Sequence, residues 1–301
     1  MGKIAFVIIN FNNISDTISC LESFRNTGLK KVDYDIYLID NGSDQQIAES
    51  NLSSFKTQLP IKLFTLNQNY GFAEGNNIGI REAQKVGYDY YVLLNNDTEL
   101  VDDSVEIMVR YLDTHPKVGI GGLVNYYYSD PDAIWQAGAR FLQKRFDYRQ
   151  VQVTDKSSGV FTEVDYVPGS SFFIKKEVID KIGLLDSNYF AYREEADYCW
   201  RAKLVGFKVG FLSNTRILHK VGKSSSSLLK QYLRFRNELY FCSKFGRSKD
   251  FLIIYARIFK RTFKIWIQSN FNYKVFMSSI IAVVDYNQGR LGYGSIDKMK
   301  K

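Results

Sequence analysis

The chain has 301 residues, of which 45% are hydrophobic, so it can bury a large core and is not a disordered protein. Its formal net charge of +8 favours an anionic partner: a nucleic acid, a phosphate-bearing substrate or a membrane face. No run of about 18 apolar residues occurs, and the first residues do not resemble a signal peptide. We therefore expect neither a transmembrane anchor nor export. Cys20, Cys199 and Cys242 have neither metal-ligand spacing nor a disulfide framework, which predicts reduced, mostly buried thiols.

The first hundred residues alternate between strand-like and helix-like patterns. Apolar runs predict strands, and apolar residues at three- and four-residue spacing predict helices. The predicted strands span residues 4–10, 34–39, 61–66 and 90–94, and the predicted helices span residues 15–25 and 75–86. This alternation predicts an α/β fold with a mostly parallel sheet between helices.

Polar residues gather where these strands end. The segments are "NFNN", "DNGSD", "NQNYGFAEGNN" and "NNDTEL", in chain order. Each alone is consistent with a polar turn, since Asn, Asp and Gly favour turns. Because ligands of such sheets bind outside the carboxyl ends of the strands, the four segments together predict a pocket at this edge.

The remaining chain is less regular. Residues 118–128 resemble another strand, and residues 141–159 predict a loop or hairpin over the pocket. Residues 167–186 read as a strand and a short helix, and residues 189–212 as a helix and a strand. From residue 228 onward the pattern is helical, basic and aromatic.

Eight segments occur in an order that resembles the family 2 glycosyltransferases, and most of all the rhamnosyltransferase-like subgroup. They are "VIINFNN", "DNGSD", "NYGFAEGNNIGI", "LLNNDTEL", "VPGSSFFIKKEVIDKIGLLD", "YREEADYCWRA", "ILHKVGKSS" and "RFRNELY". The resemblance covers nearly the whole chain and implies the GT-A fold. Residues 1–222 would form the nucleotide-sugar-binding and catalytic domain, and residues 223–301 a helical region for acceptor, membrane or oligomer contacts.

The implied activity is a non-processive transfer with inversion at the anomeric carbon. One sugar would move from dTDP-rhamnose or a UDP-hexose to a hydroxyl of a glycan or lipid-linked acceptor, in the synthesis of a cell-surface polysaccharide. In the family the aspartate after the second strand binds the base, which here is Asp40, and a carboxylate can accept from an N–H of uracil or thymine. The other nucleotide-binding positions that the resemblance implies are Asn10, Asn12, Asn69, Gly71, Asn76, Asn95 and Asn96.

The fourth strand of the family ends in an Asp-x-Asp motif that holds a divalent cation against the diphosphate. Here the motif reads Asn95-Asn96-Asp97, so Asp97 is its one anionic ligand. The family often supplies a metal-binding histidine where this chain has His219. We therefore expect Mn²⁺ or Mg²⁺, both of which take oxygen ligands, with imidazole better suited to Mn²⁺.

Two lysines after that histidine are the candidates for diphosphate contacts. Lys220 and Lys223 would act as point charges on the phosphates. The missing first carboxylate at Asn95 keeps an alternative open, in which the protein is catalytically inactive and only binds a nucleotide or a partner.

The segment "YREEADYCWRA" supplies the candidate acids and bases. Asp197 and Arg201 stand four residues apart, which predicts a salt bridge that orients the helix. In the family the second acid of this motif is the general base, so Glu195 takes that role, with Glu194 as the alternative.

Residues 244–264 interleave lysines and arginines with aromatic and aliphatic residues, and Asp250 is their one acid. This pattern predicts either a helix that lies on an anionic membrane surface or ordinary packing, including a homo-oligomer contact. Lipid-linked acceptors, which are frequent in the family, favour a cytoplasmic enzyme on the inner membrane face. No recognition motif supports a nucleic-acid-binding protein.

Overall fold

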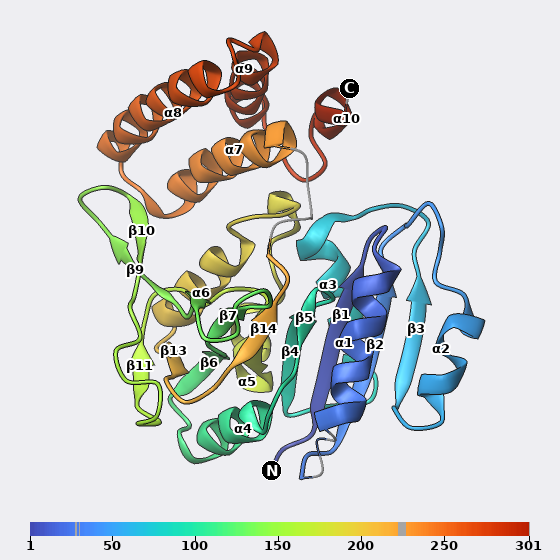
Figure 1. The fold of residues 1–301 in the computed structure, drawn as a ribbon. Coiled ribbons are helices and arrows are strands. Elements are labelled where there is room, and N and C mark those ends of the chain that lie inside the picture. Colours follow the sequence, from blue (N-terminus) through green and yellow to red (C-terminus); the bar gives the residue numbers. More distant parts are fainter. Residues whose placement is uncertain (28, 30, 222–226, 301) are drawn as a thin grey trace.

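The four strands predicted in the first hundred residues lie in one sheet (Figure 1). The computed structural model describes residues 1–301 except 28, 30, 222–226 and 301. Within that part, eight strands pair in the order β11-β13-β6-β12-β4-β1-β2-β3. They are β1 (Ile4–Asn10), β2 (Tyr34–Asp40), β3 (Ile61–Thr65), β4 (Tyr90–Asn95), β6 (Val118–Gly122), β11 (Phe161–Glu163), β12 (Ser171–Lys175) and β13 (Lys208–Leu212).

The pairing confirms a mostly parallel α/β fold. β1 is parallel to β2 and β4, and β2 is parallel to β3. β12 is antiparallel to both β4 and β6, so β6 points the same way as β4, and its parallel partner β13 does too. Only β12 and the edge strand β11 run against the other described strands of this sheet.

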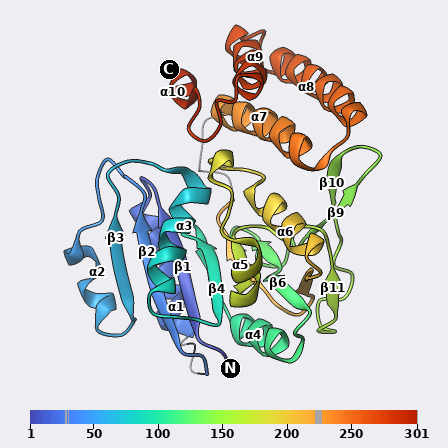
Figure 2. The same ribbon diagram turned by 180° about the vertical axis from the view of Figure 1, so that it is seen from behind.

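Helices cover both faces of the sheet because its strands are apolar on both sides. In β1, Ile4, Phe6 and Ile8 face one core cluster, and Ala5 and Val7 face the other. The first cluster includes side chains of α1 (Ile14–Thr27), α2 (Glu49–Lys56) and α4 (Ser104–Thr114). The second includes α3 (Gly71–Gln84), α5 (Lys176–Ile182) and α6 (Glu194–Leu204), which Figure 2 shows from behind.

A small second sheet carries the residues that follow β4. Its order is β5-β14-β7-β8, formed by β5 (Thr98–Glu99), β14 (Ile217–His219), β7 (Asn125–Tyr127) and β8 (Ile134–Gln136). The single strand predicted over residues 118–128 is therefore wrong, because β6 and β7 belong to different sheets. β14 pairs antiparallel with β5, and this pairing brings a distant segment of the chain beside the end of β4.

Helices form the last part of the chain, as predicted. They are α7 (Ser227–Phe245), α8 (Ser248–Gln268), α9 (Tyr273–Asn287) and α10 (Ile296–Lys300). A third apolar cluster joins α7, α8 and α9 to the hairpin of β9 (Ala139–Leu142) and β10 (Asp147–Gln150) and to residues around α6. The segment predicted as a loop or hairpin thus includes a hairpin, and its aromatic side chains pack against the C-terminal helices.

The domain boundary predicted at residues 222 and 223 falls outside the described residues, and the division stays a prediction. The third cluster contains Phe146, Phe190 and Ala196 from the first predicted domain together with Phe241 and Ile254 from the second. The three cysteines are free and buried, as predicted. In the described part of the chain, no helix combines the length and apolar character needed to cross a membrane.

Candidate active site

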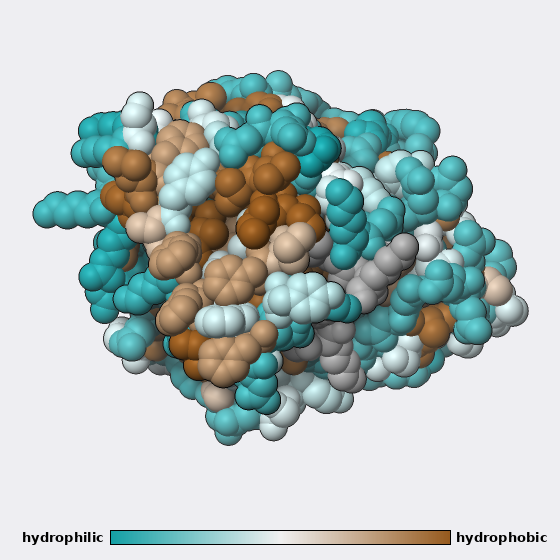
Figure 3. Space-filling view, turned by 90° about the horizontal axis from the view of Figure 1, so that it is seen from above, coloured by the Kyte–Doolittle hydropathy of each residue, from teal (hydrophilic) through white to brown (hydrophobic). Residues whose placement is uncertain are grey.

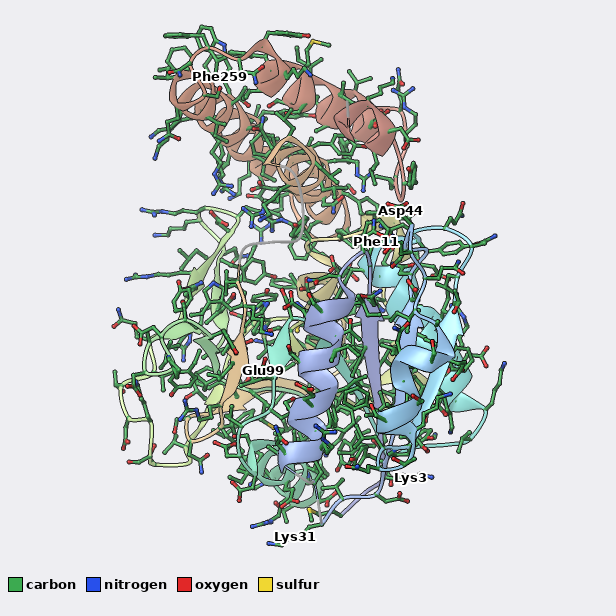
Figure 4. All side chains as sticks on the ribbon, turned by 45° about the vertical axis from the view of Figure 1, so that its right-hand side comes forward. Lys3, Phe11, Lys31, Asp44, Glu99 and Phe259 are labelled. Carbon is green, nitrogen blue, oxygen red and sulfur yellow. The ribbon has the colours of Figure 1, made fainter. Side chains whose placement is uncertain are left out.

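The carboxyl ends of β1, β2 and β4 meet at one edge of the large sheet. Asn10 and Asp40 are register partners at the ends of β1 and β2. Asn95 is the last residue of β4, and it pairs with the residue before Asn10. Phe11 and Asp44, which lie just beyond β1 and β2, point from this edge toward the C-terminal helices (Figure 4). The polar strand ends therefore lie on one side of the molecule, as the sequence predicted.

Two of the predicted asparagines form hydrogen bonds that connect the strand ends to neighbouring segments. The Asn10 side chain is buried, and its Nδ2 donates to Ser43 Oγ at 3.1 Å while its Oδ1 accepts from Thr17 Oγ1 at 3.0 Å. Asn96 Nδ2 donates to the same Thr17 oxygen at 2.9 Å and to the carbonyl of Asn13 at 3.1 Å. Both amide side chains thus help to hold this edge of the sheet together. Contact of either side chain with a nucleotide stays a prediction.

Asp40 holds a loop in this structure. Its side chain is fully buried, and its two carboxylate oxygens accept main-chain N–H groups of Ser43 at 3.2 Å and Ile47 at 2.6 Å. On the outer side of the same loop, Asn12 Nδ2 donates to Asp44 Oδ2 at 3.1 Å, and Asp44 N–H donates to Asn12 Oδ1 at 2.8 Å. The base contact predicted for Asp40 remains a prediction, whereas its role in shaping the loop was not foreseen.

The start of α3 forms the neighbouring wall. Gly71 has φ +82°, and a Cβ there would lie 2.5 Å from the carbonyl oxygen of Phe190. A side chain at this position would thus collide with Phe190, and the predicted contact of Gly71 with a nucleotide stays a prediction. Asn69 Oδ1 accepts the Gly71 N–H at 2.8 Å. Asn76 is buried and donates to the carbonyl of Phe72 at 2.9 Å, within its own helix.

Asp97 and His219 come together beside the end of β4. His219 is the register partner of Thr98 in the β14–β5 pair, which sets its ring next to Asp97. His219 Nε2 lies 3.1 Å from Asp97 Oδ1, and both side chains are largely buried. The indole of Trp135 meets the imidazole edge to face, with ring centroids 4.6 Å apart, and so restricts the orientation of the ring.

This pair fits a divalent cation. Asp97 Oδ1 is buried without a hydrogen-bond partner, since its approach to His219 lacks hydrogen-bond geometry, and His219 Nδ1 is buried and unpartnered as well. Two ligands that stand about 2.1 Å from an octahedral ion at right angles are about 3.0 Å apart. In the part of the chain that the structure describes, no cluster of three acidic, histidine or cysteine side chains could hold a metal. Further ligands would come from a diphosphate and water.

Lys220 lies beside this pair but is engaged in ion pairs. Its Nζ is 2.9 Å from Glu99 Oε1 and 3.3 Å from Asp16 Oδ1. Burial disfavours its charge, but the hydrogen bonds and charges of Glu99 and Asp16 outweigh burial and raise the pKa of Lys220. The ammonium is therefore charged at neutral pH. Its predicted contact with the diphosphate is untested, and Lys223 lies outside the described residues.

Glu194 and Glu195 open α6 in different surroundings. Glu194 is 2% exposed and its Oε2 has no hydrogen-bond partner, whereas Glu195 is only partly buried. Burial raises the pKa of both carboxyls, and the charge of Glu195 adds to the rise at Glu194. Main-chain N–H groups of Glu195, Gly169 and Arg193 partly offset the rise at Glu195. Glu195 is thus the more exposed residue of the two, which favours it as the base.

Gly169 gives the Glu195 carboxylate its place. A Cβ at Gly169 would lie 2.7 Å from Glu195 Oε1, so a side chain there would displace the carboxylate. The next residue links this point to β4, because the Asn95 N–H donates to the Ser170 carbonyl at 3.2 Å. The candidate base therefore lies close to the strand end that leads to Asp97.

Asp197 has a structural role, as predicted. Arg201 Nε donates to its Oδ2 at 2.7 Å, and Lys244 of α7 forms an ion pair with its Oδ1. Tyr189 OH donates to that oxygen at 3.2 Å. Asp197 thus joins α6 to α7 and to the loop that precedes α6.

Sequence reasoning missed three residues that shape the site: Gly169, Trp135 and Asn77. Asn77 Nδ2 donates to the Leu185 carbonyl at 2.9 Å, and its Oδ1 accepts the Leu185 N–H at 3.0 Å, which fastens α3 to the loop before α6. No local pattern marks these contacts, because each partner is distant in sequence. A hollow of about 480 Å³ lies elsewhere, between the end of α1 and the start of α4, and contains none of the candidate residues.

The site can be compared with known proteins. A sequence model of "Glycosyl transferase family 2" matches residues 5–183, the region that holds Asp40 and Asp97. The chain is 21% identical over 246 residues to "dTDP-rhamnosyl transferase RfbF" of Shigella flexneri, covering 78% of each chain. It is 25% identical over 262 residues to "Low-salt glycan biosynthesis hexosyltransferase Agl10" of Haloferax volcanii, covering 83% of this chain and 79% of the relative.

Among solved structures, the chain is similar to GalNAc-T7 in a crystal structure with UDP, GalNAc and Mn²⁺. The TM-score is 0.61 with 17% identity, and the match covers 79% of this chain and 50% of the other. The chain thus spans half the length of this structural relative. At this identity the likeness shows the fold, and it confirms the GT-A architecture.

Proposed function

The chain belongs to glycosyl transferase family 2, and on that premise we propose that it moves one sugar, with inversion, from dTDP-rhamnose or a UDP-hexose to a hydroxyl of a glycan or lipid-linked acceptor. As a member of this family, it is a nucleotide-sugar glycosyltransferase of glycan synthesis. One observation supports the proposed chemistry most. The partly exposed Glu195 and the Asp97–His219 pair lie at the same edge of the sheet, and Gly169 and the end of β4 connect them.

In the proposed mechanism, Glu195 takes the proton of the acceptor hydroxyl. The hydroxyl oxygen then bonds to the anomeric carbon on the face opposite the diphosphate. The bond from that carbon to the diphosphate oxygen breaks, and its electron pair leaves with the nucleotide. Because attack and departure occur on opposite faces, the configuration inverts.

Asp97 and His219 would hold Mn²⁺ or Mg²⁺, as their spacing and unpartnered atoms support. The bound ion would neutralise charge on the leaving diphosphate. The loop around Asn12 and Asp44 and the start of α3 would border the nucleotide. The cation and the nucleotide in the GalNAc-T7 structure lend support to this assignment.

A panel of sugar nucleotides identifies the donor. A donor at a hundred times its Kd should stabilise the folded state by about 2.7 kcal/mol, which thermal denaturation detects. dTDP-rhamnose is the expected donor and a UDP-hexose the next. The stabilising donor, incubated with protein and Mn²⁺, should also be hydrolysed slowly. A donor that binds and stays intact, with or without acceptors, would favour a catalytically inactive nucleotide-binding protein instead.

We propose that the protein acts at the cytoplasmic face of a membrane, which it contacts through α8 and α9. Exposed apolar side chains form one stripe on each helix, spaced by three, four or seven residues. They are Leu252, Phe259, Phe263 and Ile267 on α8, and Tyr273, Met277, Ile280 and Val284 on α9. Figure 3 shows apolar side chains gathered on the face seen from above, and Phe259 points outward in Figure 4.

Charge on these two helices suits an anionic lipid surface. Their two acids, Asp250 and Asp285, are both buried. Lys249, Lys260 and Lys264 are exposed. Each basic residue near an anionic surface contributes about 1 kcal/mol to binding, and the exposed phenylalanines would enter the headgroup region.

We expect the protein to bind vesicles that contain anionic lipid, and binding to weaken as salt screens the lysines. Phe259→Ser together with Phe263→Ser should lower partitioning by about tenfold or more, since burying one such side chain contributes about 1.5–3 kcal/mol. Leu204→Ser is the matched control, because Leu204 is exposed on α6. Equal partitioning of both variants would contradict the proposal. A concentration-dependent dimer lost in the phenylalanine variant would assign the face to a second copy.

A further inference from the structure

The loop that leads into α6 has a conformation that its residues do not favour. Phe190 (φ 62°), Tyr192 (φ 71°) and Arg193 (φ 79°) all have left-handed backbone, and none is glycine. Side chains with a Cβ rarely adopt this region, and bulky ones least of all. Such backbone persists only where surrounding contacts hold it, and it clusters at functional sites.

Asn237 of α7 supplies those contacts. Its Nδ2 lies 2.8 Å from each of the carbonyl oxygens of Tyr189, Ala191 and Tyr192. The side chain is fully buried. Arg236 Nε donates to Asn237 Oδ1 at 3.1 Å, which turns the amide nitrogen toward the loop. One side chain therefore collects the carbonyls of three residues around the left-handed turn.

The clamped loop ends at the candidate base. Arg193 is the residue before α6, and its carbonyl oxygen accepts the Asp197 N–H at 2.9 Å, so it fixes the first turn of the helix that carries Glu195. The loop also reaches the nucleotide side, because the Phe190 carbonyl accepts the Ala73 N–H of α3 at 3.1 Å. The position of Glu195 thus depends on backbone that Asn237 holds from the C-terminal helices.

We propose that Asn237 is a positioning residue, which places the Glu195 carboxylate for proton transfer by fixing the left-handed loop from residue 189 to residue 192. This inference rests on the proposed function. It adds a residue that is distant in sequence from the strand ends that form the site. It also gives α7 a part in catalysis in addition to packing.

The test is a double-mutant cycle on sugar transfer with the donor that stabilises the protein. Asn237→Ala should lower kcat by about 10- to 100-fold, since small misplacements of a reacting group have effects of this size. In the Glu195→Gln background the same substitution should change the residual rate by less than twofold, because the base it positions is gone. The acid limb of the kcat–pH profile should also move in Asn237→Ala, because a displaced loop changes the surroundings of the Glu195 carboxylate.

Gln231→Ala is the matched control. Gln231 is a buried amide on the same helix, and its Nε2 donates to the Val275 carbonyl at 2.9 Å, away from the loop. It should lower the melting temperature without changing kcat. Rates are expressed per nucleotide-binding site, so unfolded protein does not count. If Asn237→Ala does not fold, the same double-mutant cycle is measured with Asn237→Ser, whose hydroxyl keeps one hydrogen-bond donor.

Two results would overturn the inference. One is a kcat of the Asn237 variant within twofold of wild type. The other is a loss from the Asn237 substitution that is as large in the Glu195→Gln background as in wild type. Failure of the proposed function appears differently. In that case wild type transfers no sugar, or Glu195→Gln is as active as wild type, whatever Asn237 does.

Discussion

We expect Glu195→Gln to lower kcat by about 10²–10⁴, the usual contribution of general-base catalysis, with the affinity for the donor nucleotide nearly unchanged. Glutamine keeps the size of the side chain and removes its basicity. The proton moves only on the way to the transition state, so the loss appears in turnover and not in donor binding. Single-turnover transfer and donor titration of the same variant separate the two quantities.

The pH profile provides a second measure of the same group. Burial raises the pKa of Glu195, and the base acts only when it is ionised. Activity should therefore fall as pH decreases through a value above the ordinary glutamate pKa of about 4.3. Glu195→Gln should remove this acid limb. A limb that stays in place in the variant would assign it to another group.

Glu194→Gln is the control for the assignment within the pair. Glu194 is buried with an unpartnered oxygen, and its raised pKa means that the folded state disfavours its charge. Above that pKa the buried charge lowers stability, so Glu194→Gln should raise the melting temperature at alkaline pH and keep most of the turnover. If it abolishes turnover while Glu195→Gln stays active, Glu194 is the base. If both stay active, the proton acceptor is another group.

The sheet was predictable because parallel strands buried on both faces are continuous apolar runs. Residues 4–10 and 61–66 differ from β1 and β3 by one residue at most. α2 was missed because only Leu52 and Phe55 of its side chains are buried, which is too few for a helical period. α3 starts four residues before the predicted helix, since Gly71 opens it with a positive φ that glycine adopts without strain and without a Cβ that would collide with Phe190.

The site was predictable in its location and less so in its contacts. Polar strand ends indicated the edge, but the same amides and carboxylates that bind ligands also satisfy main-chain groups. Asp40 shows the ambiguity, because the structure uses it to hold a loop. The left-handed backbone at Phe190 and Tyr192 could not be predicted at all. Local preference opposes it, and the contacts of the distant Asn237 override that preference.

The second large effect that we expect concerns the proposed metal site. Chelation of divalent cations should lower transfer by more than about 10²-fold, because the charge leaving with the diphosphate loses its main electrostatic partner. His219→Ala should weaken Mn²⁺ binding, measured by titration in the presence of the nucleotide, by at least about 10- to 100-fold, the loss typical even of residues that only support a ligand. Asp97→Asn should have the larger effect, because it removes the one anionic ligand that the motif retains.

The second histidine is the matched control for these variants. His115 stacks on Tyr111 with ring centroids 3.8 Å apart, at the end of α4, and His115→Ala should leave both Mn²⁺ affinity and transfer unchanged. Full transfer in excess chelator would refute the requirement for a metal. Normal Mn²⁺ affinity in His219→Ala, together with a loss of affinity in Asp97→Asn, would show that Asp97 is a metal ligand and His219 is not. Because Asn95 carries no charge where the family has a carboxylate, binding in the absence of nucleotide should be weak. We therefore expect the nucleotide to increase Mn²⁺ affinity, since its phosphates complete the oxygen ligands that the protein lacks.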